Sequence, residues 1–219
     1  MVWYLLLAHF LADYLLQPDW MVRAKTRLRV LALHVATHFL VTLAIVGSSR
    51  GILVPYILVL ALVHFEIDLV KNMVYRHKPN WVIIPYLTDQ VIHYLSIVAV
   101  TLWIRNQAGE IFLPADPQGL IYMLGLVLVT YVWFISERIF AYKDEEYRRE
   151  LVDQIWSRMF VRAGIVSFLL MGWNLGSQVL AFGITVSLPY GKGRYGRRAL
   201  ATDIVVSFVV VVLIQLAIG

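Results

Sequence analysis

Histidine and aspartate recur four residues apart in the first 93 residues of the chain. The pairs are His9 with Asp13, His34 with His38, His64 with Asp68, and Asp89 with His93. Residues four apart lie on one face of a helix, so both members of a pair can meet the same neighbour. Imidazole nitrogens and carboxylate oxygens are ligands for zinc, manganese and iron. The chain has no cysteine, which excludes thiolate metal sites, iron–sulfur clusters and disulfides.

The segments that carry these pairs are apolar. Hydrophobic residues make up 60% of the 219 residues, charged residues make up 15%, and the mean hydropathy is +0.73. Soluble domains are about 45–50% apolar and about 25% charged, so this composition predicts an integral membrane protein. The apolar stretches near the length of a bilayer crossing are Val2–Gln17, Val30–Val46, Ile52–Lys71, Trp81–Ile104, Leu120–Phe140, Val161–Leu188 and Ala199–Ile218. They lack two-residue alternation, so we expect an all-α polytopic fold with about seven spans.

Basic residues alternate between the loops and predict the orientation. The loop after the first span holds Arg23, Lys25, Arg27 and Arg29, the loop after the third holds Lys71, Arg76 and Lys78, and the second and fourth loops hold one arginine each. The positive-inside rule then places the first and third loops in the cytoplasm and the N-terminus outside. We expect the protein to lie in a bacterial inner membrane. These charges, which give a pI near 9.5, are expected to meet anionic lipid headgroups rather than nucleic acid.

The paired residues share one predicted depth. Counted from the cytoplasmic ends of the first four spans, all eight lie roughly 5–18 Å inside the membrane at about 1.5 Å rise per residue. Each ionisable group near the bilayer centre costs about 2.5–3.5 kcal/mol or more, so such groups mark function by default. A shared cation would remove this cost by neutralising the buried charge. The pattern therefore predicts a metal site between four helices; a proton relay and interhelical hydrogen bonding are the alternatives.

The predicted metal ligands are five histidines and two aspartates: His9, His34, His38, His64, Asp68, Asp89 and His93. They would hold one or two divalent ions. Zinc is the preferred candidate, and manganese and iron are the alternatives. Asp13 is predicted to be a ligand or the general base, and Lys71 to neutralise Asp68 or contact an anionic substrate. His77 is expected to be exposed. Glu137 is a candidate for an additional ligand or base.

The two halves of the chain have different predicted roles. We expect residues 1–104 to form the four-helix metal-site core and residues 105–219 to form a C-terminal membrane region. Residues 142–160 carry both charge signs and predict a helix at the cytoplasmic surface. Residues 161–188 are long for one crossing and are interrupted at Gly172–Gly176. Either this segment is re-entrant, or it crosses once against the charge rule.

Four stretches, HFLADYLLQ, HVATH, HFEIDLVKN and DQVIH, resemble the helices of an uncharacterised prokaryotic integral-membrane family, a domain of unknown function. The likeness is strongest over the first four spans. It implies a helical membrane fold and brings no established activity. A looser likeness connects the chain to membrane-bound metal-dependent hydrolases, whose helices carry histidine and aspartate in a different order and spacing.

The leading functional hypothesis is metal-dependent hydrolysis of a lipid or lipid-linked substrate from the cytoplasmic side. The second is a metal-ion or proton-coupled transporter, which an interrupted helix within residues 161–188 would support. The third is a haem-binding redox protein with axial histidines, which the neighbouring aspartates argue against.

Overall fold

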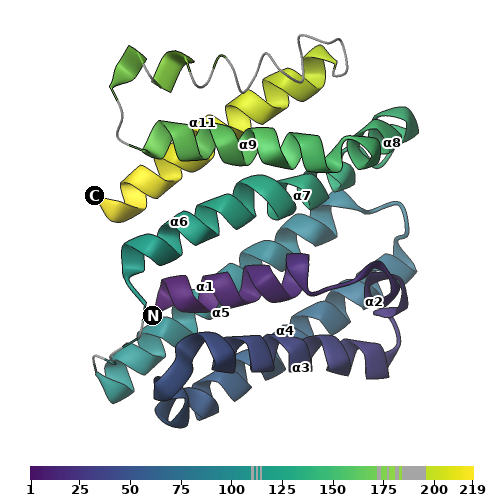
Figure 1. Cartoon of the computed structure of the whole chain (residues 1–219). Helices are drawn as coiled ribbons and strands as arrows, with labels where there is room; N and C mark the ends of the chain where they lie inside the picture. The colour runs from purple at the N-terminus through teal and green to yellow at the C-terminus, as the bar shows by residue number, and fades with distance from the viewer. Residues whose placement is uncertain are drawn as a thin grey trace. The chain divides into compact units, whose positions relative to one another are not determined.

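Every regular element in the described part of the chain is a helix (Figure 1). The structure is a computed structural model, and it describes residues 1–109, 111, 113, 115–171, 174–176, 178–180, 183 and 196–219. The chain divides into two compact units, unit 1 (Met1–Leu120) and unit 2 (Ile121–Gly219). The all-helical class predicted from the sequence is therefore confirmed.

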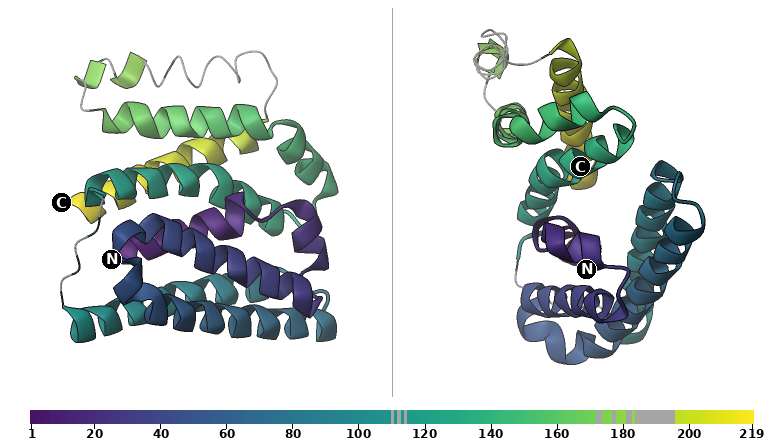
Figure 2. Two further views of the ribbon diagram at one scale, coloured as in Figure 1. Left: turned by 60° about the horizontal axis from the view of Figure 1, so that its bottom comes forward. Right: turned by 90° about the vertical axis from the view of Figure 1, so that its right-hand side faces the viewer.

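Four of the helices in unit 1 pack in a ring. They are α1 (Val2–Phe10), α3 (Leu28–Val46), α4 (Arg50–His77) and α5 (Ile83–Ala108). Helix α1 packs against α3 and α5, α3 packs against α4, and α4 packs against α5, so each helix has two neighbours (Figure 2). At the end of α3, Gly47 adopts a positive φ of 59°, a conformation that glycine takes without a steric penalty, and the chain turns there into α4.

The first helix changes its winding before it ends. Residues Leu11–Leu15 form a π-helical turn, η1, in which Leu16 donates its backbone N–H to the carbonyl of Leu11 at 2.9 Å. Single π-helical turns within helices are often found at functional sites. Pro18 follows and begins the short helix α2 (Asp19–Ala24). The widened turn carries Asp13, one member of the first predicted pair.

Among the described residues, five helices are long and apolar enough to cross a membrane. They are Leu28–Ser49, Gly51–His77, Ile83–Ala108, Pro117–Phe140 and Arg197–Ile218. The first apolar helix, Val2–Leu15, is shorter, and at about 1.5 Å per residue it is about 21 Å long, less than a bilayer core of about 30 Å. The protein is thus a helical membrane protein, and its five longest apolar helices coincide with five of the seven predicted spans.

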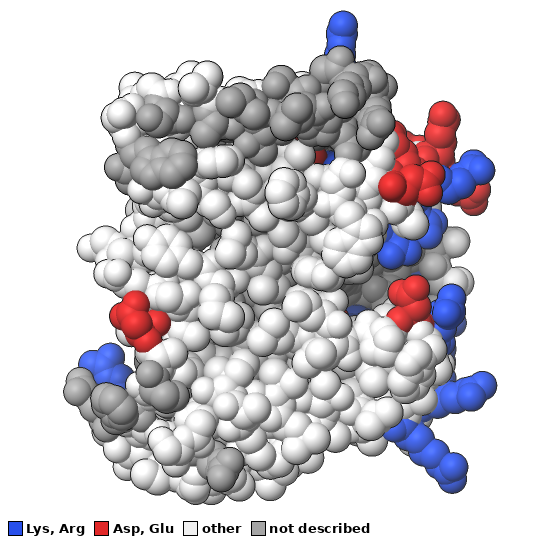
Figure 3. Space-filling model, in the orientation of Figure 1, with Lys and Arg blue, Asp and Glu red and all other residues white. Residues whose placement is uncertain are grey.

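One end of unit 1 is basic and polar. The segment between α2 and α3 lies beside the end of α4, because Asn72 and Arg76 donate hydrogen bonds to the backbone carbonyls of Lys25 and Thr26 at 3.1 and 2.9 Å. Lysine and arginine side chains project from the end of unit 1 that carries α2 (Figure 3). We call this the basic end.

The opposite end of the unit 1 bundle is apolar. A buried core there consists of Leu5, Val46, Leu53, Ile57, Ile97, Val100 and Ile104. These side chains come from the starts of α1 and α4 and the ends of α3 and α5. Burial of such side chains contributes about 1.5–3 kcal/mol each in water, whereas in lipid the contribution comes mainly from close packing.

Unit 2 begins with one continuous helical stretch. Helix α6 (Pro117–Val127), the π-helical turn η3 (Leu128–Val132) and α7 (Trp133–Phe140) follow one another without a break. Helices α8 (Glu145–Asp153), α9 (Ile155–Leu170) and α11 (Arg197–Ile218) are the longer helices described after it. Asp144 caps α8 by accepting the backbone N–H of Tyr147. That hydrogen bond and the Arg198 guanidinium lower the pKa of the Asp144 carboxyl below its ordinary value.

The helix boundaries in unit 2 differ from those expected for residues 142–188. The expected surface helix 142–160 is divided at Gln154, and the residues from Ile155 onward belong to α9. The expected interruption at Gly172–Gly176 lies just after the end of α9 at Leu170, but Gly172 and Trp173 are outside the described residues. Residues 184–195, which the re-entrant alternative and the last basic loop require, are also outside them.

The expected boundary between the surface helix and the following span, at residues 160 and 161, was misplaced because two arginines of α9 are buried. Arg158 and Arg162 are 2% and 1% exposed, and both pair with the fully buried Asp203 of α11, at 2.6 and 3.1 Å. Arg158 also donates to Glu137 at 3.0 Å, and Glu137 accepts the hydroxyl of Tyr147 at 2.6 Å. Glu137, a candidate for an additional ligand or base, is therefore engaged by charged and polar groups within unit 2.

Replacing Asp203 by asparagine is expected to destabilise unit 2 by about 3–5 kcal/mol, because two buried guanidinium groups lose their shared carboxylate. The measurement is thermal unfolding in detergent followed by tryptophan fluorescence. Asp153→Asn, at an exposed position, is the matched control and should leave the midpoint unchanged. Equal midpoints for the two variants would contradict this role of Asp203.

Candidate metal centre

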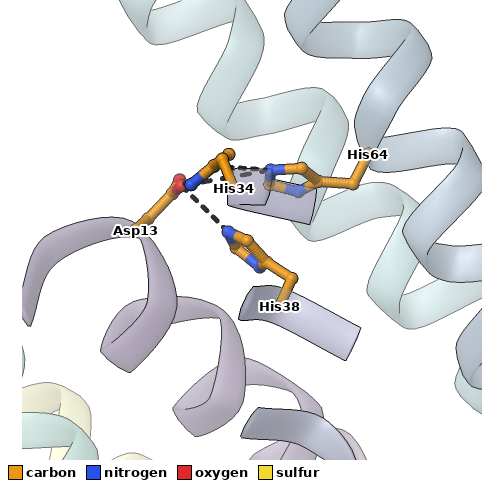
Figure 4. A group of neighbouring side chains, drawn as sticks. All are labelled: Asp13, His34, His38 and His64. Carbon is orange, nitrogen blue, oxygen red and sulfur yellow. Dashed lines mark hydrogen bonds and ion pairs between the residues drawn. The ribbon is translucent and has the colours of Figure 1, made fainter. Parts of the chain in front are cut away.

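Four side chains from three elements of unit 1 converge on one point. Asp13 of η1, His34 and His38 of α3, and His64 of α4 face one another (Figure 4). Asp13 Oδ1 lies 3.0 Å from His34 Nε2, 3.1 Å from His38 Nε2 and 4.0 Å from His64 Nε2. One atom from each residue can be chosen so that all four lie within 4.8 Å of one another. The three histidines are buried, with His34 fully so.

The spacing of these atoms fits a small cation. Ligand atoms about 2.0–2.1 Å from a tetrahedral zinc ion lie about 3.3 Å from one another. His34 Nε2 and His64 Nε2 are 3.2 Å apart, and the two shorter distances to Asp13 Oδ1 are similar. In a hydrogen bond between two Nε2 atoms only one can carry the proton, whereas a cation binds both lone pairs. A centre of one carboxylate oxygen and three imidazole nitrogens therefore matches the donor set of zinc and of other divalent transition metals.

His9 and His93 lie on the side of the centre that faces the apolar core. With His64 they form a second group whose nitrogen atoms lie within 4.8 Å of one another. The ring of His64 stacks on that of His93 with centroids 4.0 Å apart, and His9 Nε2 lies 3.5 Å from Asp13 Oδ2. A cavity of about 20 Å³, room for roughly one water molecule, is bordered by His9, His38, His64 and His93.

Asp68 and Asp89 are held by lysines. Lys25 Nζ lies 2.7 Å from Asp68 Oδ2, and Lys71 Nζ lies 2.7 Å from Asp68 Oδ1 and 2.7 Å from Asp89 Oδ2. Asp68 Oδ2 is also 3.3 Å from His64 Nε2, and Asp89 Oδ1 is 3.3 Å from His93 Nε2. The two aspartates thus connect the lysines to the imidazoles, and their predicted role as direct ligands stays a prediction.

A buried hydrogen-bond network supports the remaining side of the site. Gln90 donates to Asp89 Oδ2 at 3.1 Å and to Asp13 Oδ2 at 3.5 Å. Its side-chain oxygen accepts the hydroxyls of Tyr14 and Tyr94 at 3.0 and 3.1 Å. These bonds orient the carboxylates on which the histidines depend, as outer-shell groups do around metal ligands.

Comparison with protein families identifies a matching family. The family described as "Protein of unknown function (DUF3307)" matches residues 1–115, more than half of the chain. The chain belongs to the DUF3307 family. This confirms the resemblance to an uncharacterised family that the four helical stretches indicate. Neither the curated proteins nor the solved structures gave a significant match.

The DUF3307 region contains the complete candidate site. Residues 1–115 fall within unit 1, and they include all nine residues predicted to bind metal, act in catalysis or contact an anion. The structure brings all nine together. It leaves Glu66 and His77 exposed, and His77 bonds to the carbonyl of Met73 on its own helix.

Sequence reasoning missed three polar groups of this DUF3307 site. Lys25 resembles a loop residue that sets topology, yet it is 8% exposed and paired with Asp68. Gln90 adjoins Asp89 in the chain and reaches both Asp13 and Asp89. Tyr14, next to Asp13 in the chain, donates its hydroxyl to the side-chain oxygen of Gln90. The four-residue spacing of Gln90 and Tyr94 was the one available signal for this network.

Proposed function

We propose that this DUF3307 protein is a metal-dependent hydrolase that acts on a lipid or lipid-linked substrate at the basic end of unit 1. The observation that carries the proposal is the convergence of Asp13 Oδ1 and the Nε2 atoms of His34, His38 and His64. Three of the distances between these four donors are 3.0–3.2 Å, close to the ligand separations around zinc, and a cation would offset the cost of placing such groups inside an apolar bundle.

The charge balance of the site is suited to a divalent cation together with an anionic substrate. Three carboxylates, those of Asp13, Asp68 and Asp89, face two ammonium groups, those of Lys25 and Lys71. With neutral imidazoles the site carries one net negative charge, and a divalent ion changes this to one net positive charge. A buried excess charge is costly, and a site that is positive with its metal suits an anionic substrate such as a phosphate ester.

The residues around the cavity can support hydrolysis. When bound, a divalent metal lowers the pKa of a coordinated water and polarises a phosphoryl or carbonyl oxygen. His9 lies beside the cavity and 3.5 Å from the Asp13 carboxylate, so it is placed to accept a proton from water there. Gln90 fixes Asp13, and Lys71 supplies positive charge for an anionic group.

The closure of the centre on one side supports our choice of hydrolysis over transport. Transport requires a polar path through the membrane, but the centre is closed on one side by the apolar core of unit 1. The proposed support for transport, an interruption within residues 161–188, falls largely outside the described residues. A haem would need its macrocycle between two axial histidines, whereas the His38 and His64 rings are in contact, with centroids 3.8 Å apart.

The test uses the purified full-length protein in detergent, loaded with zinc or manganese. It is incubated with a panel of phospholipids and lipid-linked phosphates, and products are measured by mass spectrometry. We expect one lipid class to be cleaved, cleavage to stop with a chelator, and activity to return when metal is restored. Metal flux into proteoliposomes without any cleavage would overturn the proposal in favour of transport.

Lys71 further indicates one ion rather than two. Asp68, Asp89 and His93 form a third group that could hold a cation, but the Lys71 ammonium lies 2.7 Å from both of its carboxylates. We expect Lys71→Met to raise the metal content from one to two ions per chain, measured by elemental analysis, because a second cation replaces the lost ammonium. The control is Lys78→Met, at an exposed position. A content of one ion in folded Lys71→Met would contradict this assignment.

A further inference from the structure

A groove lies between α4 and α5 on unit 1, outside the ring of histidines. Its volume is about 440 Å³, within the range of ligand pockets of about 300–1,000 Å³. Most of its lining is apolar, including Val70 and Val74 of α4 and Ile84 and Ile92 of α5. Val70 and Ile84 are each 59% exposed, so this surface has no protein cover within unit 1.

The surroundings of the groove identify its occupant as lipid. Both helices that form it are long and apolar enough to span a membrane, and the exposed apolar side chains of the groove are suited to contact with the hydrocarbon of the bilayer. Trp81 lines the groove, close to the first residue of α5, and aromatic residues at such positions mark the membrane–water interface. An acyl chain fits this combination of an apolar wall and an interfacial tryptophan.

The polar lining of the groove comes from Glu66 and Lys71 of α4 and from Thr88 and Asp89 of α5. Lys71 and Asp89 belong to the candidate metal centre, and their side chains are joined at 2.7 Å. Lys78 Nζ lies 4.0 Å above the ring of Trp81, which places a second positive charge beside the groove. Lys71 is paired with Asp68 and Asp89, so Lys78 is the lysine beside the groove whose charge complements an anionic headgroup.

We propose that this groove binds the acyl chain of an anionic phospholipid, whose headgroup lies toward Lys71 and Lys78. The molecule would then reach the centre sideways from the bilayer rather than through water. Binding in the groove stands on its own geometry; only the further step, that the bound lipid is the substrate, rests on the proposed hydrolase function.

The test is photocrosslinking in nanodiscs with a trace of phosphatidylglycerol that carries a diazirine on one acyl chain. We expect labelled peptides to be concentrated in residues 70–92, with saturation as the probe is increased. Unlabelled phosphatidylglycerol should displace the probe at least fivefold more effectively than phosphatidylcholine. Labelling spread evenly over all lipid-facing helices would overturn the proposal of a specific lipid site in the groove. Equal competition by phosphatidylglycerol and phosphatidylcholine would overturn the preference for anionic lipid.

Filling the groove provides the matched variants. Val70→Trp and Ile84→Trp should each lower labelling of residues 70–92 at least fivefold, because the new side chains occupy the acyl site. Leu62→Trp on α4 and Leu95→Trp on α5 are the controls, since both positions are exposed and neither lines the groove. Equal labelling in filled and control variants would show annular lipid only and would overturn the proposal.

A metal-depleted variant separates this proposal from the hydrolase. His34→Ala should still be labelled in the groove, because His34 does not line it. If the groove is labelled but the metal-loaded wild type cleaves no lipid, the lipid-binding groove is supported and the hydrolase proposal is rejected. If Val70→Trp and Ile84→Trp cleave lipid at the wild-type rate, the hydrolase proposal is supported and entry of the substrate through the groove is rejected.

Discussion

Replacing His34 or His64 by alanine is expected to abolish metal retention during purification. Each substitution removes one of four converging donors and leaves a gap within the bundle. Loss of an outer-shell partner alone typically costs 10–100-fold in metal affinity, so loss of a direct ligand should cost about 100-fold or more. Metal per chain is measured by elemental analysis after dialysis, together with titration of the metal-free protein.

The chain offers a matched control for this experiment. His77 is the one histidine outside the paired set; it is exposed and bonds to its own helix. His77→Ala should therefore retain the metal content of the wild type. If His34→Ala and His64→Ala were folded and retained that content too, the metal centre would be disproved. His34→Gln, which keeps polar bulk at the site, guards against a loss of metal caused by collapse of the bundle.

Asp68→Asn is expected to destabilise unit 1 by about 3–5 kcal/mol, because both lysine ammonium groups then lose a buried carboxylate partner. Asp68 is fully buried and lies 2.7 Å from Lys25 and from Lys71. The measurement is the unfolding midpoint of the metal-free protein in detergent, so that loss of metal does not contribute. Glu66→Gln on the same helix is the control, since Glu66 is exposed and should tolerate the change.

A second substitution distinguishes lost charge pairing from a general packing defect. Asp68→Asn combined with Lys25→Met removes one of the ammonium groups left without its partner, so part of the lost stability should return. A double variant no more stable than Asp68→Asn would contradict the ion-pair explanation. The same outcome would indicate that Asp68 acts mainly by orienting His64, which lies 3.3 Å away.

The sequence alone was sufficient to predict the class of protein and the proximity of the paired histidines and aspartates. Apolar composition required helices, because lipid offers backbone groups no other partners. The four-residue spacing of each pair then fixed which residues share a face of their own helix, and loop charges placed those faces at one depth. Both are local properties of the chain, and the structure accordingly brings His9, His34, His64 and His93 together.

Only the tertiary structure decided which polar atom faces which. Helical periodicity does not fix how four helices rotate against one another, so it could not assign Asp13 to the histidine centre while Lys25 and Lys71 neutralise Asp68. From the sequence, Lys25 and Arg158 are expected to be surface charges, because charged residues near apolar segments usually face lipid headgroups. Both are buried because a distant segment supplies a carboxylate, and that pairing depends on packing rather than on any local pattern.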